Sequence, residues 1–321
     1  MAAELDLHRC ITKMPHTKRE CYDRTRLYFL VYICDHHYSL SHGRPPMTRE
    51  LRSLKTPRAL LQSEFSTPSD PKLISQVELW GISNRVFEVF GADIQNPSIR
   101  SRSTELDQLS SAYDRWRHEW LEVLKIRNTL DDFASHTFEL YFYSAKLYLF
   151  SHVFRGPSQR DLEPPVTANG MYQFAHGAVE SAVAIIRFMT DEEDAQAWLG
   201  KLPSYFVTTI AFASVFLLRT ARQEQPVYDV DKDQVLQYLR RLTELLRGSA
   251  MVINPSHLLL SVADSLEVAI DRRGNDSEIV TNSPVDYDIW GEDVFGLNFF
   301  DTWMGYPEPC CPPVGVFGEI L

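Results

Sequence analysis

Histidine and cysteine side chains near the N-terminus are the residues of this chain best suited to hold a metal ion. A zinc site needs thiolates or imidazoles spaced so that several reach one ion, as two histidines four residues apart do on a helix. The candidate ligands are His8, Cys10, His16 and Cys21, followed by the adjacent pair His36 and His37. The first four are sparsely spaced, and neighbouring residues point about 100° apart on a helix, so neither set converges on one ion. We therefore expect surface or capping histidines and no metal ion bound by this chain.

Motifs for catalysis are absent from the sequence. It contains no G-x-S-x-G, no phosphate-binding loop, no dinucleotide-binding glycine pattern and no cysteine in a recognisable nucleophile context. The acidic pairs Asp131-Asp132 and Glu192-Glu193 are better explained as solvated helix starts, where carboxylates interact favourably with the helix dipole. We predict that the chain is not an enzyme, and an enzyme of unrecognised type stays as the third alternative.

Charge is unevenly distributed along the chain. The net charge is −11, from 32 basic and 43 acidic residues, and residues 273–321 alone contain nine acids and one arginine. The body is therefore close to neutral, without the strongly basic surface that holds duplex DNA, and we expect no direct nucleic-acid binding. Five cysteines without C-x-x-C spacing favour a reducing compartment. We expect no signal peptide and no membrane span, because the most hydrophobic stretch, residues 205–218, is shorter than the about 20 residues that a span needs.

Helix signals follow one another up to residue 272. Caps or prolines open the predicted helices, and apolar residues recur every three or four positions within them. These helices begin near Thr17, Asp70, Thr104, Asp131, Met171, Pro203, Asp231 and Pro255. The one after Asp131 is apolar nearly all round, which is typical of the middle of a bundle. We predict an all-α fold, a bundle or array of about eight to ten helices over residues 1–272, with a separate acidic, partly disordered tail over 273–321.

The most informative segment runs from Thr17 to Arg49. Thr17 and Glu20 form a capping box at its start, and Gly43 followed by two prolines ends the helix. Apolar residues recur at helical spacing between these ends and give one stripe: Leu27, Leu30, Val31, Cys34 and Tyr38.

This segment resembles the middle homology region of fungal binuclear zinc-cluster transcription factors. The shared features are an arginine-rich helix start, an aromatic and aliphatic run, an aspartate near the helix end and a Gly-Arg-Pro-Pro turn. In this chain they are Arg24, Arg26, the run 27–34, Asp35, Gly43, Arg44, Pro45 and Pro46. The version with Cys34-Asp35-His36-His37 is most similar to regulators of secreted proteases in filamentous fungi.

The resemblance implies a regulatory and interaction domain that acts in RNA polymerase II transcription, with genes of secreted proteases as targets. It implies a nuclear location, with the cytoplasm as the alternative for this short form. The family's DNA-binding module needs six cysteines that bind two zinc ions, and no such repeat occurs here. Zinc and DNA binding are therefore expected only in a longer form, and no cofactor in this chain. The implied partners are the transcription machinery or coactivators, and the full-length factor in a homodimer or heterodimer.

Asp35 and Arg44 can interact at the end of the first predicted helix. The Arg44 guanidinium can fold back to the last helical carbonyls or to the Asp35 carboxylate. Two interpretations stay open, a brace for the turn and the lining of a regulatory pocket. Arg24 and Arg26 near the helix start oppose its dipole, so we expect a carboxylate partner for at least one of them.

Acidic and aromatic residues alternate in the tail, and no lysine or arginine occurs between residues 275 and 304. This composition is typical of disordered activation segments whose rings dock into an apolar groove. The predicted partner-binding residues are Trp290, Phe295, Phe299, Phe300 and Trp303. The alternative is that these rings pack on the chain's own bundle as a C-terminal latch.

A second functional hypothesis is a small-molecule sensor. Its pocket would lie among aromatic residues of the helices, and the candidates are Trp80, Trp116, Trp120 and Tyr141. An aromatic stripe at helical spacing is more often simply core.

Overall fold

The computed structural model describes residues 17–41, 46–48, 57–91, 102–128, 130–154, 169–191, 199, 201–222, 231–249 and 258–275. Within these ranges the chain forms helices and no β-strand, which confirms the predicted all-α fold. The predicted tail residues lie outside the described ranges, as do Gly43, Arg44 and Pro45 of the turn.

The predicted helices are all present near their expected positions. In chain order they are α1 (Lys18–Ser41), α2 (Asp70–Phe90), α3 (Ser103–Ile126), α4 (Asp132–Ser151), α5 (Asn169–Thr190), α7 (Ser204–Arg222), α8 (Lys232–Gly248) and α9 (Leu258–Asn275). Two short 3-10 segments, η3 (Pro57–Gln62) and η5 (His152–Phe154), precede α2 and follow α4. None of the helices so described has the length and apolar character to span a bilayer.

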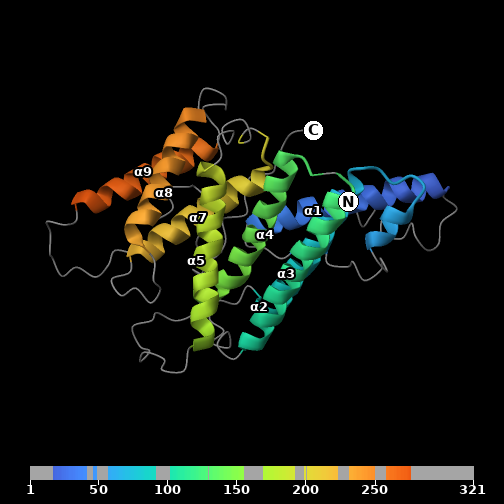
Figure 1. Ribbon diagram of the computed structural model, residues 1–321, viewed down its shortest axis with the longest axis horizontal. Helices are drawn as coiled ribbons and strands as arrows, with labels where there is room; N and C mark the ends of the chain where they lie inside the picture. The colour runs from blue at the N-terminus through green and yellow to red at the C-terminus, as the bar shows by residue number, and fades with distance from the viewer. Residues whose placement is uncertain are drawn as a thin grey trace, which may run out of the picture.

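Consecutive helices pack side by side. The main pairs are α2 with α3, α4 with α5 and α8 with α9, and α7 lies against α5 and α8. Figure 1 shows α2, α3, α4 and α5 as steep rods, with α1 running across them. Helix α1 contacts α2, η3 and α7, so it joins the N-terminal pair to the second half of the bundle.

Helix α4 lies in the middle of the bundle, as its apolar sequence predicted. Its buried side chains include Phe138, Leu140, Tyr141, Phe142, Leu147, Tyr148, Leu149 and Phe150. Helix α5 approaches it closely at Gly177, where a Cβ atom would lie 2.7 Å from Cε2 of Phe150. A side chain at this position would therefore force the Phe150 ring or the two helices to shift.

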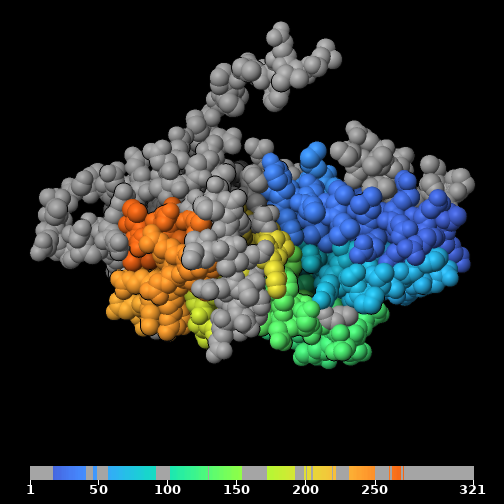
Figure 2. Space-filling model, turned by 90° about the horizontal axis from the view of Figure 1, so that it is seen from above, coloured from blue at the N-terminus to red at the C-terminus, as the bar shows by residue number. Residues whose placement is uncertain are grey.

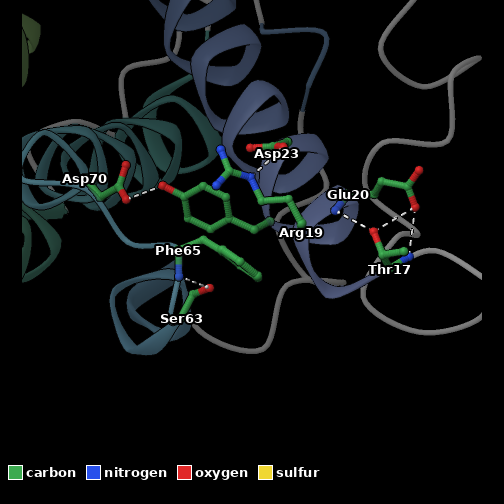
Figure 3. A network of polar contacts seen from close by, with 8 residues as sticks. Thr17, Arg19, Glu20, Asp23, Ser63, Phe65 and Asp70 are labelled. Atoms are coloured by element: carbon green, nitrogen blue, oxygen red, sulfur yellow. Dashed lines mark hydrogen bonds and ion pairs between the residues drawn. The ribbon is translucent and has the colours of Figure 1, made fainter.

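Polar side chains start several helices. At α1, the Thr17 amide donates to Oε2 of Glu20 at 2.8 Å and the Glu20 amide donates to Oγ1 of Thr17 at 3.2 Å, which confirms the capping box (Figure 3). At α4, Asp131 accepts from the Ala134 amide at 2.6 Å. Helix α2 differs from the expected pattern, because Ser69 takes the cap position and Asp70 lies inside the helix.

Candidate functional site

The apolar stripe of α1 faces solvent. Leu27, Leu30 and Tyr38 are 48%, 39% and 56% exposed, and Cys34 is an exposed free thiol. The core-facing side of the helix instead carries large aromatic rings: Tyr22, Tyr28, Phe29 and Tyr32. These rings bury more apolar area than the stripe would, which decides the orientation of the helix. Figure 2 shows α1 as a continuous part of the molecular surface, so the stripe is a candidate interaction surface.

Asp70 holds α1 against the start of α2. Its fully buried carboxylate accepts from the Tyr22 hydroxyl at 2.6 Å, from Nε of Arg26 at 3.0 Å and from the Thr67 amide at 2.7 Å. Figure 3 shows the hydrogen bond that reaches Asp70 from the α1 side. The expected carboxylate partner of an α1 arginine is therefore confirmed for Arg26.

The same contacts set the charge state of Asp70. Burial acts to raise the pKa of its carboxyl group, but the hydrogen bonds from Thr67, Tyr22 and Arg26 together outweigh burial and lower the pKa. Asp70 is therefore ionised in the folded protein at neutral pH.

Asp35 braces the segment that follows the turn. Its Oδ2 accepts from the Thr48 amide at 2.7 Å and from the Thr48 hydroxyl at 2.5 Å. This pairing supports the brace interpretation of Asp35, while its predicted partner Arg44 lies outside the described residues. Arg24, also part of the family motif, is half-buried on α1.

His37 lies in a cluster of aromatic rings from four helices. Its ring stacks on Tyr205 of α7 at 4.6 Å between centroids and on Tyr141 of α4 at 5.8 Å, and it meets the edge of Trp80 of α2 at 5.0 Å. Neither Nε2 of His37 nor Nε1 of Trp80 has a hydrogen-bond partner. The cluster thus joins α1 to the centre of the bundle mainly through ring packing.

Burial keeps the two α1 histidines neutral. Nδ1 of His36 lies 2.8 Å from the Tyr32 carbonyl oxygen, so this nitrogen carries the proton, and Nε2 has no partner. Burial lowers the pKa of His36 to about 4. Burial also lowers the pKa of His37 to about 3, and the neighbouring His36 adds to the effect.

A cavity of about 170 Å³ lies between α2, α3 and the start of α4. Its apolar lining consists of Trp116, Leu124, Leu130, Phe133, Ala134, Phe138 and Tyr141. Its polar lining consists of Lys72, Ser75, Gln76, Asp131 and Thr137. An apolar pocket with a few polar groups is the usual form of a small-molecule site.

The structure separates the four aromatic residues that were predicted to line one pocket. Trp116 and Tyr141 do line the cavity. Trp80 lies in the His37 cluster instead. Trp120 donates its Nε1 proton to Glu78 at 2.8 Å and lies under the Arg58 guanidinium, so it has a structural role.

The other lining residues carry no sequence signal that marks them as ligand-binding. Lys72 follows a helix-start proline, and Asp131 was explained as a helix start. The two residues meet at one cavity only because α2 packs beside the start of α4. Among the described residues, no group of three or more potential ligands could hold a metal ion, and the candidates His8, Cys10 and His16 lie outside these residues.

Comparison with known proteins identifies a fungal relative. The chain is 28% identical over 280 residues to the transcriptional activator of proteases prtT of Emericella nidulans. The match covers 85% of this chain and 42% of that protein, so the chain spans less than half the length of its relative. No family model and no solved structure matches. The chain is therefore related to a fungal transcriptional activator, which confirms the predicted resemblance.

Proposed function

We propose that this chain is a regulatory and interaction module of a fungal zinc-cluster-type transcription factor. The observation that carries the proposal is the similarity to a transcriptional activator over 85% of the chain. The module acts in RNA polymerase II transcription through protein contacts, in the nucleus, and performs no catalysis. DNA binding through a zinc cluster belongs to a longer form of the protein. Because the relative is named an activator of proteases, genes of secreted proteases are the proposed targets.

The helical body, residues 1–272, would hold the regulatory conformation. Three contacts support this role, because each fixes α1 to another part of the chain. They are the buried Asp70 network, the Asp35–Thr48 pair and the ring cluster around His37. Helix α1, here called the motif helix because it carries the residues of the family resemblance, is therefore the element whose position a partner would detect.

The acidic tail, residues 273–321, is the proposed activation segment. We expect residues 274–321, fused to an unrelated DNA-binding domain, to raise reporter output severalfold over the bare domain, because the aromatic rings dock on coactivators. The matched variant keeps every acidic residue and replaces Trp290, Phe295, Phe299 and Trp303 by alanine. This variant should lose the gain. Reporter output from the fusion that equals the output from the bare domain would refute the activation role and favour the latch alternative.

The outward stripe of α1 is the proposed contact for a second copy of the chain. Leu27, Leu30 and Cys34 follow the spacing of three and four residues that lets one helix pack along another. A two-fold axis along the stripe would bring the same residues of both copies together. This arrangement would also serve a heterodimer with the full-length factor.

Light scattering during gel filtration checks the α1 contact. We expect twice the mass of one chain, and the mass of one chain when Leu27 and Leu30 are both replaced by lysine. Ile126→Lys is the matched control, because Ile126 is 80% exposed at the end of α3. Mild oxidation should link the dimer covalently, and Cys34→Ser should prevent the link, because a two-fold axis along the stripe brings the two Cys34 residues together. A monomer at every concentration would refute the contact.

The cavity favours a second candidate function, the sensing of a small molecule. A space of about 170 Å³ beside buried Trp116 and Tyr141 can admit a ring-sized compound. A bound compound would contact Tyr141, which also stacks on His37 of the motif helix. Saturable thermal stabilisation by a metabolite is the expected result for a sensor.

A further inference from the structure

The cavity between α2, α3 and α4 combines a floor of aromatic rings with charged side chains. Trp116, Phe138 and Tyr141 are each no more than 5% exposed, and the first two rings stack at 4.7 Å between centroids. Lys72 is half-buried and Asp131 is exposed, so these two charged residues belong to the mouth of the cavity. The cavity lining therefore combines buried aromatic rings with two opposite charges that reach solvent.

Both charges at the mouth are available to a ligand. Lys72 forms no ion pair with any carboxylate of the described residues, Asp131 included. Asp131 uses Oδ1 to cap α4 through the Ala134 amide, which leaves its other oxygen able to accept. A cation and a carboxylate at one opening match a ligand that carries both charges itself.

The volume limits the apolar part of the ligand. A dry cavity of about 150 Å³ admits a benzene molecule, and this cavity measures about 170 Å³. One six-membered ring or a branched aliphatic group therefore fits over the aromatic floor. The charged groups of such a ligand would stay at the mouth, where desolvation is least costly.

We propose that this cavity binds an apolar α-amino acid, an inference that rests on the sensor function. The ligand's carboxylate pairs with Lys72, its ammonium group pairs with Asp131, and its side chain packs on Trp116 and Phe138. Tyr141 forms part of the same floor and stacks on His37 and Tyr205. Occupation of the cavity would therefore stiffen the contact between α4, the motif helix α1 and α7.

Calorimetric titration of the full chain tests the assignment with L-phenylalanine as the probe. Hydrocinnamate lacks the ammonium group, phenethylamine lacks the carboxylate, and toluene lacks both. We expect phenylalanine to bind about tenfold more tightly than either singly charged compound, the usual effect of one charge-assisted hydrogen bond. Glycine, which has no apolar side chain, should not bind.

Two variants test which residue pairs with each charged group of the ligand. Lys72→Met should bind phenylalanine no better than phenethylamine, because the carboxylate has lost its partner. Asp131→Asn should bind phenylalanine no better than hydrocinnamate, and asparagine keeps the helix cap, so the fold is preserved. Each variant should keep the preference that depends on the other residue.

The outcomes separate the ligand class from the sensor function. If toluene and all three charged or zwitterionic aromatic compounds bind equally, the cavity is a ring site and the amino-acid assignment is wrong. If neither phenylalanine nor L-leucine binds, the amino-acid assignment fails, whereas saturable thermal stabilisation by another metabolite would still support the sensor function. Unaltered selectivity in both variants would likewise overturn the roles of Lys72 and Asp131.

Discussion

Acidification from pH 6.5 to about 5 is expected to lower the free energy of unfolding by about 3 kcal/mol. In the unfolded chain His36 and His37 take up protons near their ordinary pKa of 6.5, whereas burial lowers the folded pKa values to about 4 and about 3. The unfolded state therefore binds more protons throughout this interval. Stability falls as the pH decreases below 6.5, by up to about 1.4 kcal/mol per pH unit for each histidine, and levels off below the folded pKa values.

Urea denaturation across this pH range measures the loss. His37→Phe keeps a ring between Tyr205 and Trp80 but does not titrate, so the pH dependence should fall by about half. His118→Gln is the matched control, because His118 is exposed on α3 and the replacement should leave the loss caused by His36 and His37 in place. An unfolding free energy that stays constant between pH 6.5 and about 5 in the natural protein would contradict the lowered pKa values of the two histidines.

Replacing Asp70 by alanine is expected to lower the free energy of unfolding by about 3 kcal/mol. The change leaves the buried Tyr22 hydroxyl and the Thr67 amide without their acceptor, and it removes the partner of Arg26. The value lies at the lower end of the range for buried ion pairs because the Arg26 side chain is 33% exposed. Denaturant unfolding at neutral pH gives the measurement.

Asp23→Ala is the matched control for Asp70. Asp23 also pairs with an α1 arginine, Arg19, at 3.0 Å, but both side chains are more than half exposed. Its loss should lower the free energy of unfolding by less than about 0.5 kcal/mol. Equal effects of the two substitutions would contradict the role of Asp70 as the anchor of α1.

Asp70 changes the free energy of unfolding over a lower pH range than the two histidines do. Because its folded pKa lies below the ordinary value of 3.8, its contribution is fully present above that pH and is lost only as the pH falls through the lower folded value. Asp70 therefore adds nothing to the pH dependence expected between 6.5 and about 5.

Local signals in the sequence predicted the elements of this fold well. The Thr17–Glu20 capping box, the central position of α4 and a carboxylate partner for an α1 arginine all follow from short-range rules, and each is present. The signals for these features lie within one or two helical turns, although the partner that Arg26 finds, Asp70, lies 44 residues away.

Long-range packing determined what the sequence left open. Periodicity detected the stripe containing Leu27 and Leu30. A second face of α1 carries larger aromatic rings, and this face packs against the bundle instead of the stripe. Asp70 looked like a helix cap, and its buried role follows from the approach of Tyr22, 48 residues earlier. Lys72 and Asp131 meet at one cavity only because α2 packs beside α4, which no local pattern encodes.

Deletion of the gene that encodes this chain, followed by sequencing of the organism's RNA, tests most directly whether the protein regulates transcription. We expect the levels of a defined group of transcripts to change, with those of secreted proteases among them. A change confined to other genes would retain the regulatory role and remove the proposed targets. Transcript levels that remain the same throughout would contradict a function in gene regulation.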